Sequence, residues 1–287
     1  MRSLKLLNKK MRKIEDPGGG DGLLLFILET IVDYLEVKPT RQIVEFGAHP
    51  DEGGVVLDFL IQKGYKAILI EGATKYFDGL CEQYKDNNNV TCINCFVDYQ
   101  GPNTLEKILS ETDIEKVFDV LLIDVDSIDY QIWESFKSYQ PLVVVIEYNE
   151  TYGPNLNRVH NKDFNKWAAE NNKTTQDGFI GSSSVAGSSL TAINDLAKKK
   201  GYALLTFTRN NAFFVKEELF HYFHLNEIDI ERNYTPALLN IPNRVLSISD
   251  IIKKVLNFGL VETFFMYRQQ KRFGIVTKIK GLFRKAS

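Results

Sequence analysis

Short runs of apolar residues alternate along the first half of the chain with stretches in which apolar positions recur at helical spacing. The runs predict strands near residues 41–47, 66–71, 90–97, 117–124 and 141–148, and most of the stretches between them predict helices. An apolar helix is also predicted over residues 23–35, after a glycine-rich break at 16–22. Strands and helices that alternate in this way form βαβ units, which build a parallel sheet covered on both faces. The pattern therefore predicts an α/β protein.

The pattern changes in the second half of the chain. Residues 150–189 form a polar segment rich in Asn, Lys, Gly and Ser, and segments of this kind inside a compact domain usually have a function. A helix follows over residues 190–200, capped by Ser188 or Ser189. Two short apolar strands then predict a hairpin that closes the sheet, at residues 202–207 and 212–215. A final hairpin argues against an NAD-binding Rossmann domain, whose sheet continues in parallel.

The segment from residue 43 to residue 72 points to a nucleotide-type ligand. A buried strand leads into a tight turn at Gly47 and Ala48, and the next buried strand ends on Glu71. Such a turn can present backbone N–H groups, and a carboxylate in that place accepts both hydroxyls of a ribose. A dinucleotide fingerprint would need glycine where His49 stands, because the backbone must approach a pyrophosphate closely. A ligand with a ribose and a cationic or zwitterionic tail suits the turn better, and S-adenosylmethionine (SAM) is such a ligand.

Several segments resemble, in their order and spacing, the motifs of class I SAM-dependent methyltransferases. They are VEFGA at 44–48, LIEG at 69–72, FDVLLIDVD at 118–126, VVVIEYN at 143–149 and NAFFV at 211–215. Within that class the chain is similar to a bacterial group related to FkbM-type sugar O-methyltransferases. The resemblance implies a Rossmann-like fold with SAM as cofactor: a mostly parallel seven-stranded sheet, a C-terminal antiparallel hairpin, and helices on both faces.

The resemblance and the composition together divide the chain into three parts. We expect a basic N-terminal extension over residues 1–17 and a methyltransferase domain over residues 18–218. Within that domain, residues 150–189 are the variable substrate or lid segment. Residues 219–287 are expected to form a helical, basic appendage with a role of its own.

The resemblance also implies a set of residues that bind the cofactor. They are Glu45, Gly47, Ala48, Glu71, Gly72, Asp98 and Asp124. Glu45 is expected beside the methionine part of SAM, although it could instead tie down neighbouring backbone amides. Asp98 is expected near the adenine amine, with a simple turn residue as the alternative. Asp21, in the turn before the first helix, lies close to the cofactor in similar sequences, but a helix cap explains it equally well.

Carboxylates at the ends of the fourth and fifth strands suggest the chemistry. Asp124, Asp126 or His49 is the expected general base, which removes a hydroxyl proton while the oxygen attacks the sulfonium methyl. His160 is a reserve candidate for the base. His49 could equally be a polar wall of the site, and Asp126 could merely cap the next helix.

A metal-assisted alternative uses the same region of the sheet. Asp124, Asp126, Glu147 and Asn149 offer the oxygen ligands that Mg²⁺ prefers, and a bound metal would acidify the hydroxyl of the acceptor. We favour the unassisted base and predict no metal. A zinc site at Cys92 and Cys95 is disfavoured, because residues three apart on a strand point to opposite faces.

The acceptor is predicted by elimination and by resemblance. Enzymes that methylate amino groups of nucleic acids carry a proline-rich motif after the fourth strand, whereas residues 124–127 of this chain contain no proline. No cysteine nucleophile for carbon methylation lies in that region. Oxygen remains, and the FkbM-like resemblance implies a hydroxyl of a sugar, glycan or related small molecule. The alternatives are a non-catalytic SAM-binding scaffold in a glycan assembly complex and an RNA methyltransferase.

Charge is unevenly distributed along the chain. Residues 1–14 carry an excess of +6 and residues 251–287 an excess of +8, so the formal net charge of −2 leaves −16 for the residues between. An acidic body opposes nucleic-acid binding, which needs a basic surface. Basic ends instead suit an anionic membrane surface, or are simply solvated helix faces. With three cysteines and no apolar run of membrane-spanning length, we expect a cytoplasmic protein with peripheral contact to the inner membrane face. The sequence does not predict the oligomeric state.

Overall fold

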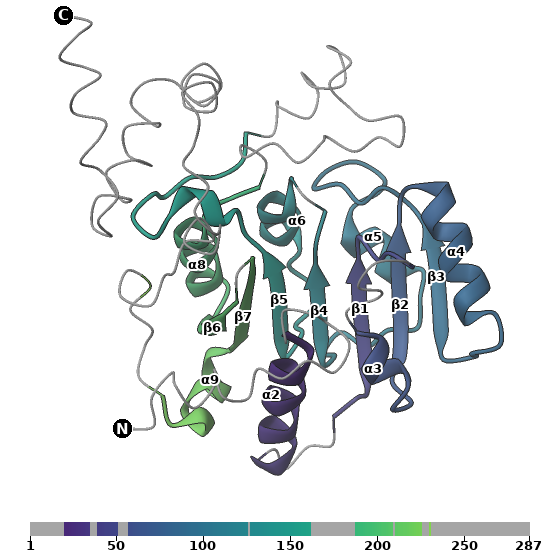
Figure 1. The fold of residues 1–287 in the computed structure, drawn as a ribbon, viewed down its shortest axis with the longest axis horizontal. Coiled ribbons are helices and arrows are strands. Elements are labelled where there is room, and N and C mark those ends of the chain that lie inside the picture. The colour runs from purple at the N-terminus through teal and green to yellow at the C-terminus, as the bar shows by residue number, and fades with distance from the viewer. Residues whose placement is uncertain are drawn as a thin grey trace, which may run out of the picture.

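The computed structural model describes residues 20–34, 39–50, 57–125, 127–161, 187–208, 210–225 and 230. Over these residues strands and helices alternate as the hydrophobic pattern predicts (Figure 1). The strands are β1 (Gln42–Phe46), β2 (Lys66–Glu71), β3 (Val90–Asn94), β4 (Val120–Ile123), β5 (Val143–Glu147), β6 (Tyr202–Phe207) and β7 (Asn211–Lys216). The helices are α2 (Gly20–Tyr34), α3 (Asp58–Ile61), α4 (Thr74–Tyr84), α5 (Leu105–Ser110), α6 (Asp129–Ser135), α8 (Leu190–Lys199) and α9 (Glu217–Phe220), with short 3₁₀ turns η1 (Glu150–Tyr152) and η2 (His221–Phe223).

The strands form one seven-stranded sheet in the order β3-β2-β1-β4-β5-β7-β6. Strands β1 to β5 pair in parallel, while β7 is antiparallel to both β5 and β6. The mostly parallel sheet and its final antiparallel hairpin are therefore confirmed. The chain builds outward from β1 to β3 and then returns to β4 on the other side of β1. In open sheets of this kind, ligands bind at the carboxyl ends of the strands beside such a reversal.

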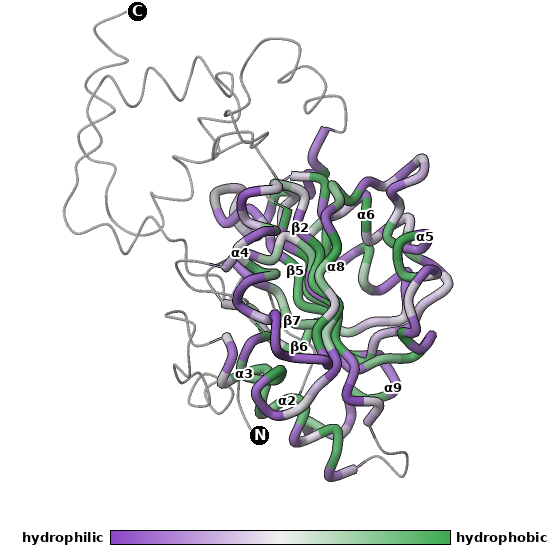
Figure 2. Tube along the Cα trace, turned by 90° about the vertical axis from the view of Figure 1, so that its right-hand side faces the viewer, coloured by the Kyte–Doolittle hydropathy of each residue, from purple (hydrophilic) through white to green (hydrophobic). Residues whose placement is uncertain are grey.

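Apolar side chains pack into two core layers, one on each face of the sheet. One layer lies under α2, α3 and α4, and the other under α5, α6 and α8. Figure 2 shows the apolar strands between these two groups of helices. Neighbouring residues of a strand serve opposite layers, as Ile43 and Val44 of β1 do. Because both faces are covered, the central strands are continuously apolar, which explains their runs in the sequence.

The packed domain continues past the predicted boundary at residue 218. Leu219 and Phe223 are buried in the core layer of α2, and the ring of Tyr222 stacks on that of Tyr34 with a centroid distance of 5.2 Å. The start of the predicted appendage thus belongs to the folded unit. Residues 1–19 and 231–287 lie outside the described residues.

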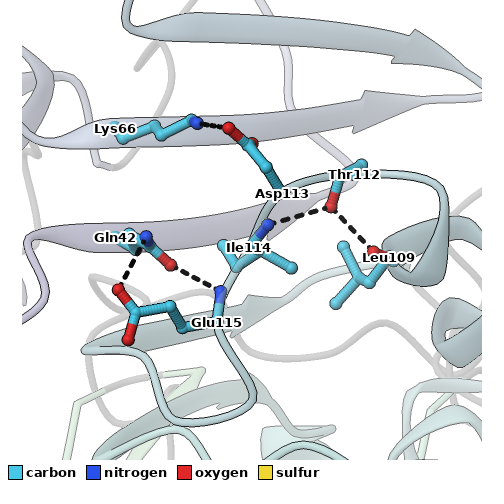
Figure 3. A network of polar contacts seen from close by, with 7 residues as sticks. All are labelled: Gln42, Lys66, Leu109, Thr112, Asp113, Ile114 and Glu115. Carbon is cyan, nitrogen blue, oxygen red and sulfur yellow. Dashed lines mark hydrogen bonds and ion pairs between the residues drawn. The ribbon is translucent and has the colours of Figure 1, made fainter.

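Polar contacts tie together the amino ends of the central strands. Gln42, at the start of β1, exchanges two hydrogen bonds with Glu115 in the loop before β4 (Figure 3). In the same view Lys66, at the start of β2, pairs with Asp113 of that loop. The loop that leads into β4 is therefore anchored to the starts of β1 and β2.

Asp119 is a fully buried acid in this region. Its carboxylate accepts hydrogen bonds from the Thr40 N–H at 3.1 Å, the Thr40 hydroxyl at 3.1 Å and the Arg41 N–H at 2.9 Å. Arg41 has a φ of 57°, a left-handed conformation that is costly for a residue with a Cβ atom. The three bonds hold the chain in this conformation as it enters β1. They thereby fix the start of β1 next to the start of β4.

We expect Asp119→Ala to lower the free energy of unfolding by about 2 kcal/mol, because three donors lose an acceptor whose own side chain is fully buried. Urea unfolding followed by circular dichroism measures this. Asp113→Ala is the control, since its ion pair with Lys66 is exposed to solvent and should contribute little to stability. Equal losses in the two variants would contradict the anchoring role of Asp119.

Candidate active site

The turn after β1 brings two strand ends into contact. Gly47 has a φ of +79°, and a Cβ atom built on it would lie 1.6 Å from the backbone oxygen of Asp124. Only glycine fits this conformation and this approach. The N–H groups of Gly47 and Ala48 donate to the Ile70 oxygen of β2, at 3.0 and 3.3 Å. Both amides are therefore engaged within the protein, so any contact of this turn with a ligand uses other atoms.

Glu71 ends β2 beside this turn. Its side chain is 6% exposed, and its carboxylate accepts a hydrogen bond of 2.6 Å from the Ala73 N–H. Burial raises the pKa of Glu71, while the N–H groups of Ala73 and Gly72 and the nearby His49 oppose the rise. A carboxylate has about four acceptor positions, so Glu71 retains the capacity to accept two further donors.

Phe96 is a candidate site residue that the sequence did not reveal. A Cβ atom on Gly72 would lie 2.2 Å from the Phe96 ring, so the ring rests directly on the backbone that follows Glu71. The side chain is nevertheless 59% exposed. The sequence predicts a buried strand through residue 97, whereas β3 ends at Asn94 and Phe96 lies in the next loop. An aromatic face beside a buried acid suits a planar, polar ligand such as a nucleobase.

Asp98 lies two residues further along the same loop. Its carboxylate accepts a hydrogen bond from the Tyr99 N–H at 2.6 Å, and its own N–H donates to the Asn103 oxygen at 2.9 Å. These bonds are those of a turn residue. A contact with an adenine amine stays a prediction.

His49 leans towards α4. Its ring packs against that of Tyr76 at a tilt of 52°, with a centroid distance of 4.0 Å. It is close enough to Glu71 to lower the pKa of that carboxyl. Pro50, the next residue, packs so closely on Gly79 of α4 that a Cβ atom there would lie 2.7 Å from it. The structure therefore places His49 beside Glu71. Its role as base stays a prediction.

Glu45 lies buried within β1. One of its carboxylate oxygens accepts a hydrogen bond of 3.1 Å from the Leu57 N–H, at the start of α3. This contact is the structural alternative considered above, in which Glu45 ties down a neighbouring backbone amide. Residues 51–56, between the turn and α3, lie outside the described residues, and a contact with the methionine part of a ligand stays a prediction.

The loop after β4 is held by Asp129. This buried residue opens α6 and accepts hydrogen bonds from the Val125 N–H at 2.8 Å and the Ser127 N–H at 3.0 Å. Asp126 lies outside the described residues, so neither of its predicted roles is tested. Asp129 is therefore the described carboxylate that holds this loop. An acid at the start of a helix is the sequence signal that could have identified it.

Glu147 and Asn149 lie beyond Asp124, at the carboxyl end of β5. Glu147 accepts a hydrogen bond of 3.3 Å from the Asn210 side chain, and the Asn149 N–H donates to the Ser188 oxygen at 2.9 Å. Within the described part of the chain, no group of three or more His, Cys, Asp or Glu residues is arranged to hold a metal ion. Since Asp126 is not in that part, the metal-assisted alternative stays untested.

His160 is buried close to the start of α8. Its N–H donates to the Ser188 hydroxyl oxygen at 2.9 Å, and its carbonyl oxygen accepts from the Gln131 amide at 2.6 Å. Ser189 accepts from the Ala192 N–H at 3.2 Å, which confirms it as the cap of α8. Residues 162–186, the centre of the predicted lid segment, lie outside the described residues.

The two cysteines of β3 and its following loop face different core layers. Cys92 packs against the layer of α2 and Cys95 against the layer of α6. The prediction that they point to opposite faces of the sheet is confirmed, so the two thiols cannot chelate one ion together.

The strand order decides the fold. Five parallel strands, a reversal between β1 and β4, and β7 inserted antiparallel between β5 and β6 form a Rossmann-like sheet with a final hairpin. This is the class I methyltransferase fold. The carboxyl edge of its central strands carries Glu71, the Gly47 turn and the loop of Asp124, so the predicted site residues that the structure describes there lie where this fold binds ligands.

Comparisons with known proteins give structural likeness without sequence likeness. No protein-family model matches the chain, and no curated protein matches it by sequence. Three solved structures illustrate the likeness. The O-methyltransferase from Bacillus cereus in complex with SAH has a TM-score of 0.41 and 15% identity, with 74% of this chain and 88% of that one covered. The CurJ carbon methyltransferase has a TM-score of 0.43 and 9% identity (75% and 58% covered), and the CMeT domain of the citrinin polyketide synthase has 0.41 and 12% (69% and 51% covered). The chain thus spans little more than half the length of the latter two, and the fold assignment rests on the strand order.

We expect Gly47→Ala to lower the free energy of unfolding by more than about 3 kcal/mol, because a left-handed φ and a backbone clash add up. Gly64→Ala is the matched control: its φ is +83°, but no atom lies within 4 Å of the added Cβ, so only the cost of about 1 kcal/mol for the left-handed conformation remains. Urea unfolding of both variants separates the two effects. An equal loss of unfolding free energy in the two variants would show that the Asp124 backbone moves aside at little cost, and would contradict this expectation.

Proposed function

We propose that this protein is a SAM-dependent O-methyltransferase that acts on a hydroxyl of a sugar, glycan or related small molecule. The observation that supports it most is Glu71: a buried carboxylate that ends β2 of a class I methyltransferase sheet, beside the glycine turn of β1. A buried carboxylate needs donors to offset the loss of water, and a ribose diol supplies two.

The described residues suggest how SAM lies along the carboxyl edge of the sheet. Its ribose hydroxyls donate to Glu71. Its adenine lies on the exposed face of Phe96, within reach of the loop of Asp98. Its methionine part extends past Gly47 towards Asp124. The Bacillus cereus structure was solved with SAH, the product of such a transfer, which is consistent with this cofactor.

SAM supplies an electrophilic methyl group on a sulfonium. The protein's part is to hold the acceptor oxygen in line with the S–CH₃ bond, to exclude water and to take the proton that the oxygen releases. An O–CH₃ bond forms as the S–CH₃ bond breaks, and the proton passes to a carboxylate or histidine. Asp124 is the best placed of the described candidates, since its backbone contacts the Gly47 turn. Asp126, His49 and His160 are the others.

The acceptor class rests on the sequence. Residues 124–127 lack the proline-rich motif of amino-methylating nucleic-acid enzymes, and the acidic body of the chain opposes nucleic-acid binding. The FkbM-like motifs support a sugar hydroxyl. Both basic ends lie outside the described residues, and membrane contact through them stays a prediction. No helix in the described part of the chain is long and apolar enough to cross a membrane.

Calorimetric titration of S-adenosylhomocysteine (SAH) tests the cofactor site. We expect wild type to bind and Glu71→Ala to lose at least about 100-fold in affinity, because the ribose diol loses a charged partner. Glu82→Ala, an exposed acid on α4, is the control and should bind as wild type does. The titration is repeated with Mg²⁺, and an affinity that depends on the metal would support the metal-assisted alternative.

No binding of SAH to wild type in either buffer would overturn the methyltransferase proposal. Binding followed by no methyl transfer to any sugar, sugar nucleotide or glycan acceptor would favour the scaffold alternative instead. An affinity for RNA that falls steeply with salt would favour the RNA methyltransferase.

The pH dependence of SAH affinity tests the state of Glu71. The ionised carboxylate accepts the ribose hydroxyls, and burial raises the pKa of this group above its ordinary value of 4.5. Protons therefore compete with the ligand, so SAH affinity should fall as the pH is lowered through the raised pKa. Calorimetry across this range should show the fall in wild type, whereas Glu71→Gln should bind weakly at every pH. A fall of equal size in Glu71→Gln would assign the effect to another group.

A further inference from the structure

Two of the three cysteines lie where helix α4 packs on strand β3. This strand is the outermost one at its end of the sheet, and α4 lies along it (Figure 1). Cys81 belongs to α4 and Cys92 to β3. Both thiols are free, and both residues are partly exposed, so small molecules in solution can reach them. We call these two residues the α4–β3 cysteine pair.

The two side chains of the pair approach each other from the helix and the strand. Leu80 and Tyr84 are the buried residues of α4, and Cys81 lies three residues before Tyr84, on the same side of the helix. Cys92 packs from β3 against the core layer to which Leu80 and Tyr84 belong. Burial raises the pKa of the Cys92 thiol to about 11, and Cys81 adds to the rise through its charge and as a hydrogen-bond partner. Thiols affect each other in this way only at close range, so the pair is adjacent.

Helix α4 also borders the candidate active site. The ring of Tyr76 packs against that of His49, and Gly79 lies under the ring of Pro50. His49 and Pro50 both belong to the segment that follows the Gly47 turn. Cys81 comes two residues after Gly79, so a covalent bond at Cys81 acts on the part of the helix that touches this segment.

We propose that the α4–β3 cysteine pair is a redox modification site, at which a low-molecular-weight disulfide such as oxidised glutathione generates a reversible Cys81–Cys92 disulfide. This inference goes beyond the proposed function, because the bond forms whether or not the protein transfers methyl groups. Cys95 takes no part, since it faces the core layer on the other side of the sheet.

The reaction is a two-step thiol–disulfide exchange. With its raised pKa, Cys92 stays protonated near neutral pH, which leaves Cys81 to react first. The Cys81 thiolate attacks one sulfur of oxidised glutathione and expels one glutathione. Cys92 then loses its proton, attacks the Cys81 sulfur and expels the second glutathione. Two protein thiols are oxidised and one glutathione disulfide is reduced to two thiols, so no further reactant is needed.

The new bond should alter the position of α4. A disulfide bond is about 2.05 Å long, which is much shorter than the contact distance of two thiols, so its formation draws α4 towards β3. Protein interiors are closely packed, and a displaced helix therefore shifts the groups that touch it. Tyr76 and Gly79 should move relative to His49 and Pro50, and we expect weaker cofactor binding as a result.

Oxidation of the folded full chain with oxidised glutathione tests the site directly. Remaining thiols are blocked with N-ethylmaleimide before digestion with trypsin, which releases Cys81 in peptide 76–85 and both Cys92 and Cys95 in peptide 86–107. We expect mass spectrometry to find the two peptides joined in wild type and in the control Cys95→Ser, and separated again after treatment with dithiothreitol. They should stay separate in Cys81→Ser and in Cys92→Ser.

The same oxidation in concentrated urea is the control for the fold. In the unfolded chain Cys92 and Cys95 are the closest cysteines in the sequence, so they should pair within peptide 86–107 because the smaller loop closes more readily. A Cys92–Cys95 bond in the folded protein, separate peptides in oxidised wild type, or joined peptides in Cys92→Ser would overturn the proposal.

Titration of SAH into reduced and oxidised protein measures the effect on the candidate active site. This part rests on the proposed function. We expect oxidised wild type to bind SAH at least about threefold more weakly than reduced wild type, and Cys92→Ser to bind equally well in both conditions. Equal affinities in the two states of wild type would overturn the effect on the cofactor.

The two proposals fail separately. Joined peptides in a protein that binds no SAH in either state would leave the redox site standing and remove the methyltransferase function. Separate peptides in a protein that binds SAH would remove the redox site alone.

Discussion

The close approach of the β1 turn to the end of β4 is the contact on which the site depends. Gly47 leaves room for the Asp124 backbone where any other residue would place a Cβ atom. Its N–H and that of Ala48 reach back to Ile70 of β2. One residue thus joins three parallel strands at their carboxyl ends. The buried carboxylate of Glu71 and the loop of Asp124 are brought to the same edge because this turn takes up so little space.

Hydrogen bonds at the opposite edge of the sheet fix the position of β1 relative to β4, and so preserve that contact. Asp119, Gln42 and the loop around Glu115 join the amino ends of β1 and β4 through several hydrogen bonds. Strands are short rigid rods in a packed sheet, so a fixed register at one end fixes it at the other. The polar groups far from the ligand edge therefore serve the site through geometry, although none of them is expected to touch a ligand.

Some residues of the candidate site can be predicted from the sequence around them, and others cannot. Glu71 was predictable because an acid that ends an apolar strand has few structural explanations. Phe96 was not, since an aromatic residue close to a predicted strand end looks like core until its exposure is known. Asp129 was not predictable, because only the folded loop shows that its carboxylate meets the amides of Val125 and Ser127.

The sequence by itself determined the fold class, the number and order of the strands between residues 41 and 216, the final hairpin, the cap at Ser189 and the acid at the end of β2. These features depend on hydrophobic period, turn chemistry and caps, which act over a few residues. Tertiary structure alone decided that the Gly47 amides are used within the protein, that Glu45 bonds to Leu57, that Phe96 covers Gly72, and that a bulge in β6 places Thr206 opposite Phe213. Each of these joins positions from different elements, and their distances depend on strand order, register and one bulge, which no local pattern encodes.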